Sequence, residues 1–100
     1  MNMLTKTIMK EKERIDFMLS EYNWMLASLP KGSISKRESN GRTYFYLKYR
    51  DGSRVVTEYV KKKDLDALME QLDRRKHIET LLKSLKDEQA MAEKILGGIA

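Results

Sequence analysis

The stretch NGRTYFYLKYRDG, from Asn40 to Gly52, holds the strongest local structure signals in the chain. The dipeptides Asn40-Gly41 and Asp51-Gly52 tolerate the positive φ angles of two-residue hairpin turns. Aromatic residues crowd the segment between them and favour a β-strand. The sequence therefore predicts a strand that ends in a tight turn on each side and pairs with both of its neighbours along the chain.

Working outward from this strand gives a three-stranded antiparallel meander within residues 33–61, with strands near Ser33–Ser39, Arg42–Arg50 and Ser53–Lys61. Turns at the two dipeptides place Arg37 opposite Tyr44 and Ile34 opposite Leu47 in the first pair of strands. In the second pair they place Leu47 opposite Val56, Tyr46 opposite Thr57 and Tyr44 opposite Tyr59. We expect a row Ile34–Leu47–Val56 across the sheet.

Side chains alternate between the two faces of a sheet, so this register sorts the residues into two sets. The apolar set predicts the core face: Ile34, Phe45, Leu47, Tyr49, Val56 and Val60. The other set is aromatic and basic: Ser35, Arg37, Tyr44, Tyr46, Lys48, Arg50, Val55, Thr57 and Tyr59. Around its rim we expect Lys31, Arg42, Arg54, Lys61, Lys62 and Lys63.

Residues 3–29 read as one helix with a coiled-coil-like apolar stripe. Ile8, Ile15, Tyr22 and Leu29 recur every seven residues, and a second row carries Leu4, Met18 and Met25. Leu19 and Leu26 widen the stripe. Pro30 should end the helix, because proline disfavours helical geometry in the residue before it.

Residues 64–97 read as a second long helix, with Asp64 as its N-cap and Gly97-Gly98 as its stop. The polar run Asp73–His77 separates two apolar stripes, where we expect a bend or a change of phase without a necessary break. The predicted fold is a single α+β domain over residues 1–100. Its two helices pack as a helical hairpin or coiled coil, and apolar surface left over allows a homodimer.

The net charge of +5 is concentrated in one third of the chain. Residues 30–63 carry ten Lys and Arg against three acidic residues, a charge of +7, whereas residues 1–29 sum to zero and residues 64–100 to −2. A basic segment of this kind favours an acidic partner, either nucleic acid or an acidic protein surface.

Other chemistry finds little support in the sequence. Cysteine is absent and His77 is the only histidine, so we expect no metal site and no cofactor. No pair of carboxylates suggests a catalytic pocket, and we expect a protein that is not an enzyme. The N-terminus lacks a signal-peptide pattern and no apolar run is long enough to span a bilayer, so we expect a cytoplasmic protein without a membrane partner.

The aromatic and basic face admits two interpretations. Tyrosines that stack on bases beside cations that neutralise phosphates suit a nucleic-acid platform, and Tyr and Arg also anchor protein interfaces. Alternatively, cross-strand tyrosine pairs and surface cations merely stabilise and solubilise the sheet. Binding is favoured because the charge excess lies in the same segment. The candidate residues for nucleic acid or a protein partner are Arg37, Arg42, Tyr44, Tyr46, Lys48, Arg50, Arg54, Tyr59, Lys61, Lys62 and Lys63.

The stretch LPKGSISKRESNGRTYFYLKYRDGSRVVTEYVKKKDLDAL, Leu29 to Leu68, resembles a family of small uncharacterised bacterial proteins. A weaker likeness links it to the arm-type DNA-binding domains of integrases, which would imply that Arg37, Tyr44, Tyr46, Lys48 and Arg50 face DNA. The chain also looks like the small charged proteins of mobile elements and phages, among them anti-CRISPR proteins. That likeness implies an inhibitor of a bacterial CRISPR nuclease such as Cas9.

Three functions follow as hypotheses. The first is an inhibitor that binds a bacterial nucleoprotein complex, the second is direct binding of DNA or RNA, and the third is a coiled-coil adaptor in which the sheet is only a cap.

Overall fold

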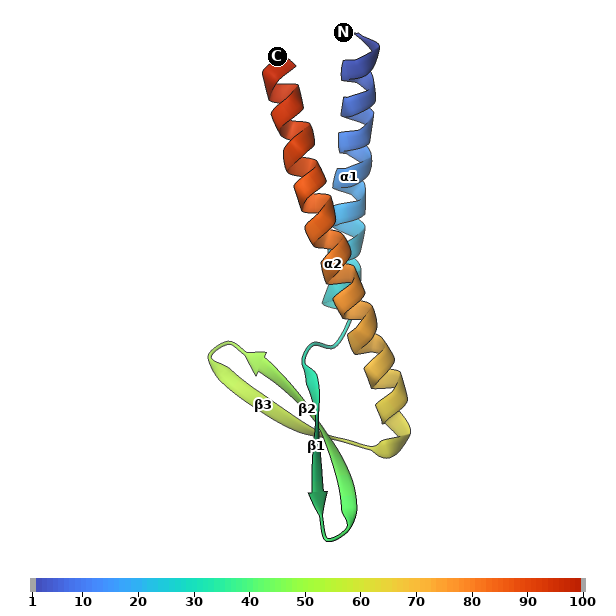
Figure 1. The fold of residues 1–100 in the computed structure, drawn as a ribbon, viewed down its shortest axis with the longest axis vertical. Helices are drawn as coiled ribbons and strands as arrows, with labels where there is room; N and C mark the ends of the chain where they lie inside the picture. The colour runs from blue at the N-terminus through green and yellow to red at the C-terminus, as the bar shows by residue number, and fades with distance from the viewer. Residues whose placement is uncertain (1, 100) are drawn as a thin grey trace. The chain divides into compact units, whose positions relative to one another are not determined.

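The computed structural model describes residues 2–99, and its five elements form an α+β fold (Figure 1). They are α1 (Met3–Ala27), β1 (Ser33–Ser39), β2 (Arg42–Asp51), β3 (Arg54–Val60) and α2 (Lys62–Ile99). The predicted fold class is thereby confirmed. The chain forms two compact units, which we name the helical unit (Met1–Ser28 with His77–Ala100) and the sheet unit (Leu29–Lys76).

Helix α1 is capped by side chains at both ends. The Asn2 Oδ1 atom accepts a hydrogen bond of 2.8 Å from the backbone N–H of Thr5, as expected of an N-cap asparagine. At the other end the Ser28 hydroxyl donates to the Met25 carbonyl at 2.8 Å. The helix thus ends at Ala27, two residues before the predicted end, because Ser28 caps it before the restriction imposed by Pro30 takes effect.

Helix α2 differs from its prediction at both ends. It begins at Lys62, and the backbone N–H of Asp64 already donates to the Lys61 carbonyl at 2.9 Å, so Asp64 lies in the first turn and is not the N-cap. It also runs uninterrupted through 73–77. The expected stop at Gly97-Gly98 is wrong, because neither glycine adopts the positive φ angle of a helix-ending residue and the helix continues to Ile99.

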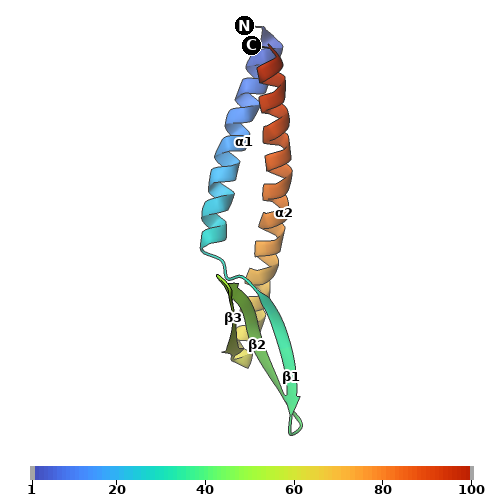
Figure 2. The ribbon, with the colours of Figure 1, turned by 90° about the vertical axis from the view of Figure 1, so that its left-hand side faces the viewer.

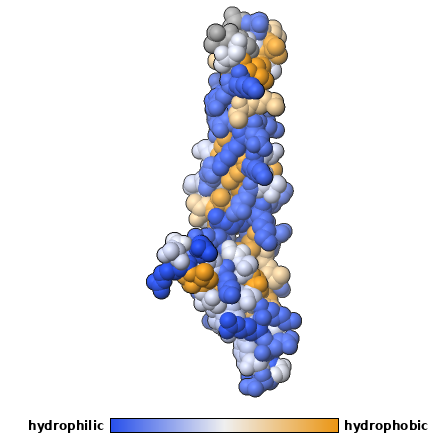
Figure 3. Space-filling model, turned by 60° about the vertical axis from the view of Figure 1, so that its left-hand side comes forward, coloured by the Kyte–Doolittle hydropathy of each residue, from blue (hydrophilic) through white to orange (hydrophobic). Residues whose placement is uncertain are grey.

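In the helical unit, α1 and the C-terminal part of α2 lie side by side and antiparallel (Figures 1 and 2). Each contributes a row with the alternating spacing of three and four residues that defines a coiled-coil seam. The buried apolar members are Ile15 and Leu19 of α1 with Ile78, Leu82, Leu85 and Ala92 of α2. Figure 3 shows hydrophobic side chains in a band along these helices, bordered by hydrophilic ones.

The α1 side of this seam differs from the predicted stripe. Ile8, Ile15 and Tyr22 belong to it as expected, but Leu4 and Met25 of the predicted second row are exposed. The second row of the seam is instead formed by residues that follow the row of Ile8, Ile15 and Tyr22 at a spacing of four. Its members are Thr5, Lys12, Leu19 and Leu26. Two polar residues concealed this row in the sequence, although Thr5 is buried in the structure.

A polar link joins the two helices beside the seam. Asp16 accepts hydrogen bonds from Lys12 at 2.8 Å and from Gln89 of α2 at 2.7 Å, and Glu93 lies 4.0 Å from the Lys12 ammonium. The hydrogen bond from Lys12, followed by that from Gln89, holds the pKa of Asp16 below its usual value. Asp16 in turn raises the pKa of Lys12. The link favours one register of the pair, because a sliding of one helix would separate these groups.

The sheet unit holds the predicted meander, in the order β1-β2-β3. The register of β1 on β2 is confirmed, with Ser39 opposite Arg42 and Ile34 opposite Leu47. Asn40 and Gly41 have φ angles of 51° and 74°, as a type I′ turn requires.

The register of β2 on β3 is wrong by two residues. Asp51 pairs with Arg54, so the turn residues are Gly52 and Ser53, and only Gly52 has a positive φ angle. Glycine at the first central position is the preference of a type II′ turn rather than of type I′. Tyr59 therefore stands opposite Tyr46, and Glu58 replaces Val56 in the row with Ile34 and Leu47. A shift of two leaves every side chain on its predicted face.

The core of the sheet unit lies between the sheet and the first part of α2. Leu47, Val60 and Leu72 are buried, and Ile34, Phe45, Tyr49, Leu65 and Leu68 pack against them. The predicted core face is thus confirmed apart from Val56, which is half-buried opposite Tyr49 but does not belong to this cluster. Arg75 of α2 donates a hydrogen bond of 3.0 Å to the Leu29 carbonyl and joins the two ends of the unit.

Candidate functional site

The candidate site is the face of the sheet that points away from Leu47 and Val60. Alternation along the observed register assigns to it the side chains of Ser35, Arg37, Tyr44, Tyr46, Lys48, Arg50, Val55, Thr57 and Tyr59, which we call the tyrosine face. Direct cross-strand neighbours on it are Arg37 and Tyr44, Lys48 and Thr57, and Arg50 and Val55.

The centre of the tyrosine face is a cluster of three side chains from three strands. The rings of Tyr46 and Tyr59 meet edge to face, with centroids 5.9 Å apart and planes inclined by 69°. The Arg37 guanidinium lies over the Tyr46 ring, 5.4 Å from its centroid, within the range of a cation–π contact. Tyr46 is half-buried, whereas Tyr59 is 58% exposed and presents much of its ring to solvent.

The tyrosine face carries positive charge alone. The three acidic residues of the strands, Glu38, Asp51 and Glu58, all fall on the opposite face by alternation. There Lys36 lies 3.8 Å from Glu38, and Tyr49 donates a hydrogen bond of 2.8 Å to Glu58, which raises the pKa of Tyr49. Arg37, Lys48 and Arg50 consequently have no carboxylate among their direct cross-strand neighbours.

The charge of the sheet unit as a whole agrees with this separation. It holds thirteen Lys and Arg against seven Asp and Glu, a formal charge of +6, which exceeds the +5 of the entire chain. The helical unit accounts for the remaining −1. Any polyanion would therefore be attracted to the sheet unit.

At one end of the tyrosine face the surface forms a hollow of about 400 Å³. Gly41, Arg42, Thr43, Tyr44, Phe45, Tyr59, Val60 and Lys62 line it. Arg42 and Lys62, two predicted rim residues, thus lie beside two of the tyrosines. The sequence did not predict this hollow, because Lys62 lies beyond the last strand and only the start of α2 places it there.

The remaining predicted site residues have different positions. Arg54 pairs with Asp51 and shares the alternation of the opposite face, so it is not part of the tyrosine face. Lys61 and Lys63 are exposed where β3 leads into α2, and neither lines the hollow. The structure therefore brings together Arg37, Arg42, Tyr44, Tyr46, Lys48, Arg50, Tyr59 and Lys62.

Among residues 2–99, no group of three or more His, Asp and Glu side chains is arranged to hold a metal ion. Neither α1 nor α2, over the residues described, has the length and apolar composition needed to cross a membrane.

The comparisons with known proteins identify a family. The family model of a domain of unknown function, DUF6788, matches residues 4–71. This match covers most of α1, the whole sheet and the beginning of α2. No curated protein and no solved structure matches the chain.

Proposed function

The chain belongs to the DUF6788 family, and we propose that it is a cytoplasmic protein that acts by binding nucleic acid through its tyrosine face, without catalysis. The observation that carries this proposal is the cluster of Arg37, Tyr46 and Tyr59 on a face whose charged side chains are all basic. The ligand that suits such a surface has flat aromatic groups and a negative backbone, and single-stranded DNA and RNA have both.

The aromatic residues would provide stacking. The ring of Tyr59 is the most accessible of the three tyrosines on this face, and Tyr46 supports it from the neighbouring strand at 5.9 Å. Stacking of one base on an aromatic side chain contributes about 1–3 kcal/mol in single-strand binding proteins. Arg37 holds Tyr46 from the other side, so the stacking surface would be formed before the ligand arrives.

The cations would provide phosphate contacts. Lys48 and Arg50 lie on β2 along the tyrosine face, and Arg42 and Lys62 line the hollow at the end of this face. If four phosphates are neutralised, the logarithm of the binding constant should fall with the logarithm of the salt concentration with a slope of about −3 for a single strand.

The test is fluorescence anisotropy with labelled single-stranded DNA, single-stranded RNA and duplex DNA over a series of salt concentrations. Tyr59→Ala should weaken binding by about tenfold, the equivalent of the loss of one stacked base. Arg50→Glu should weaken it and make the salt slope shallower. Its matched control is Arg54→Glu, since these arginines flank the same turn and differ in the face they occupy.

Equal effects of Arg50→Glu and Arg54→Glu would show that only net charge matters and would contradict a role of the face. Absence of binding to all three nucleic acids at low salt would refute the proposal.

A protein partner is the alternative outcome of this test. The resemblance to anti-CRISPR proteins points to a bacterial nucleoprotein complex such as a CRISPR nuclease, and the exposed Val55, opposite Arg50 on the same face, offers an apolar anchor for a protein. The sign of the charge favours the nucleic acid itself, because a basic face is repelled by the basic groove in which a nuclease holds its guide or target. Capture of a nuclease that survives nucleic-acid digestion, together with no direct binding, would support the inhibitor instead.

A further inference from the structure

Helix α1 carries a second apolar stripe outside the seam with α2. Three pairs of adjacent residues form it at intervals of seven or fourteen positions: Met3-Leu4, Phe17-Met18 and Trp24-Met25. Met3 is 81% exposed, Phe17 64% and Trp24 75%. A heptad repeat of exposed apolar residues is typical of a helix that packs against a further helix.

Helix α2 extends this stripe on the same side of the hairpin. Leu81, Glu88 and Ile95 each precede a seam residue of α2, as Leu4, Met18 and Met25 precede seam residues of α1. In an antiparallel pair these preceding positions flank the seam on one side, whereas Asp16 and Glu93 flank it on the other. Ile95 and the nearby Met91 are exposed. The hydrogen bond to Glu11 is the main cause of the raised pKa of Arg14, and the charge of Glu88 on α2 adds to it.

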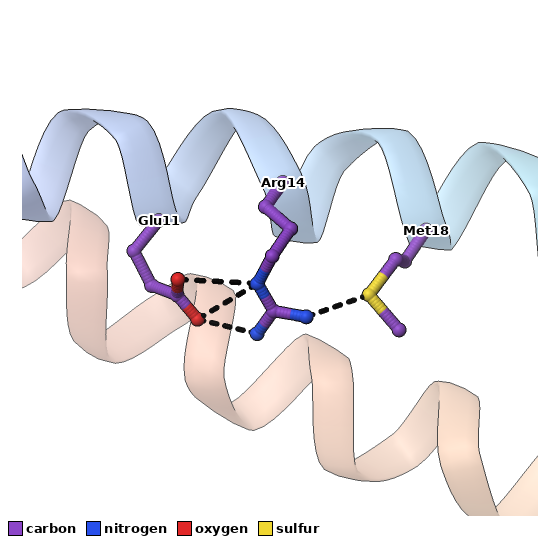
Figure 4. Close-up of polar contacts among 3 residues, drawn as sticks. All are labelled: Glu11, Arg14 and Met18. Atoms are coloured by element: carbon purple, nitrogen blue, oxygen red, sulfur yellow. Dashed lines mark hydrogen bonds and ion pairs between the residues drawn. The ribbon is translucent and has the colours of Figure 1, made fainter.

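A polar belt interrupts the apolar surface halfway along. Arg14 donates two hydrogen bonds of 3.1 Å from Nε to the Glu11 carboxylate and a further one from its terminal nitrogen, and its other terminal nitrogen lies 2.9 Å from the Met18 sulfur (Figure 4). The hydrogen bonds of Arg14 lower the pKa of Glu11. The belt is therefore an ion pair that is already formed within one helix. Burying such a pair in an interface costs less free energy than burying a single unpaired charge.

The exposed area of this apolar surface is comparable to the area that one partner buries in a protein–protein interface. From the exposed fractions of Met3, Leu4, Phe17, Trp24, Met25, Met91 and Ile95, the exposed area of these residues is on the order of 900 Å². The largest apolar patch of a typical monomer covers about 300–600 Å², and each partner in a standard interface buries about 800 Å².

We propose that this surface pairs with the same surface of a second copy, so that two helical hairpins form a four-helix bundle. A hairpin of two helices is a single layer, and a stable core requires a second one. The helical unit has a formal charge of −1, so two copies of it repel each other little. The seam positions Lys12 and Gln89 further limit how much apolar area the hairpin buries alone.

The pattern of the stripe also selects the orientation of the two copies. If the two α1 helices run parallel about a twofold axis, each apolar pair of one copy faces the same apolar pair of the other copy. The polar pair Lys10-Glu11 then faces Lys10-Glu11 of the other copy, so that lysine and glutamate of opposite charge can pair. With the helices antiparallel, Lys10-Glu11 would face Phe17-Met18 and a polar pair would be buried against an apolar one. A closed twofold dimer with parallel α1 helices follows.

Light scattering on the whole protein across a range of concentrations measures the pairing, and Trp24, the only tryptophan, reports it through a blue shift of its emission on association. Phe17→Glu and Met25→Glu should each weaken association by about thirtyfold or more, the equivalent of one interface hot spot. Met69→Glu in the sheet unit is the matched control, since Met69 is 50% exposed and Met25 44%. Circular dichroism verifies that each variant keeps its helices.

The orientation is tested with single cysteines, because the chain has none of its own. Position 21 lies between the stripe pairs and position 23 on the opposite side of α1. Glu21→Cys should form an intermolecular disulfide and Asn23→Cys should not. The proposal is overturned if the protein is a monomer at every concentration, or if Phe17→Glu leaves the dimer intact. It is also overturned if Asn23→Cys forms an intermolecular disulfide and Glu21→Cys forms none. Nucleic-acid binding by the sheet unit is measured separately and does not bear on this result.

Discussion

A single methyl group added at Gly32 should strongly destabilise the sheet unit. Gly32 has a φ angle of 120°, which side chains rarely adopt, and it leads from the end of α1 into β1. A Cβ atom there would lie 2.2 Å from the Lys48 carbonyl oxygen and 3.0 Å from both the Lys48 carbonyl carbon and the Tyr49 Cβ. The obstacle is the backbone of the central strand, which cannot move away without breaking the pairing of Ser33 with Lys48.

The cost of Gly32→Ala can be estimated from these contacts. The backbone conformation alone costs about 1–3 kcal/mol for a residue other than glycine. Relief of the overlap requires a shift of β1 or β2, and overpacking of this kind costs a further 1–3 kcal/mol or so. A total of roughly 2–6 kcal/mol is a large part of the 5–15 kcal/mol that holds a typical domain together.

Two further Gly→Ala substitutions serve as controls. Gly41 has a φ angle of 74° and no atom within 4 Å of a Cβ, so Gly41→Ala should cost only about 1–2 kcal/mol. Gly97 is helical and equally free of contacts, so Gly97→Ala should stabilise α2 by up to about 1 kcal/mol.

Urea unfolding followed by circular dichroism, with hydrogen exchange of the β2 amides, measures the three variants. The order of stability should be Gly97→Ala, wild type, Gly41→Ala and then Gly32→Ala. If Gly32→Ala and Gly41→Ala lose the same free energy of unfolding, the close approach of Gly32 to β2 is not a constraint and the reasoning fails.

Three further predictions concern the core and the polar link. Leu47→Ala should lower the free energy of unfolding by about 2–4 kcal/mol, since it leaves a cavity in the core of the sheet unit, and unchanged urea midpoints would contradict that. Gln89→Leu should raise the urea midpoint of the helices because a polar seam residue becomes apolar, whereas Gln71→Leu at an exposed position should have little effect. The pKa of Asp16 is lowered on folding, so its stabilising effect is complete above the usual value of 3.8 and is lost as the pH falls below it. Asp16→Asn should therefore show a weaker loss of helix stability in acid titrations than the wild type, and an identical acid limb would argue against the link.

The elements and the faces of the sheet could be predicted because they depend on local signals. Asn40-Gly41 set the first turn, and period-two alternation separated Leu47 from Tyr46 whichever turn followed. The second register could not be predicted in the same way, because Asp51-Gly52-Ser53 contains two possible two-residue turns. Only the φ angles, positive at Gly52 alone within this turn, distinguish them. The contact between Tyr46 and Tyr59 depends on that choice.

The helices were harder to predict where polar residues occupy positions in the seam. Lys12 and Gln89 have acceptable places there because Asp16 lies between them and accepts a hydrogen bond from each. A pattern of apolar residues alone assigns such positions to the surface, and it selected Leu4 and Met25 instead. The hollow beside Arg42 likewise depends on where α2 begins, which the sequence placed two residues too late.

The hydrogen bond from Arg75 to Leu29 has a consequence for the order in which the chain folds. The helices of the hairpin are separated in sequence by the 48 residues from 29 to 76, and closing a flexible loop of that length is slow and entropically unfavourable. Once the sheet unit has formed, Arg75 holds its two ends within one hydrogen bond of 3.0 Å, so the loop that remains is only a few residues long. The difference in closure entropy amounts to roughly 2 kcal/mol. The meander, whose pairings are all between consecutive strands, would thus fold first and act as the template on which α1 and α2 find each other.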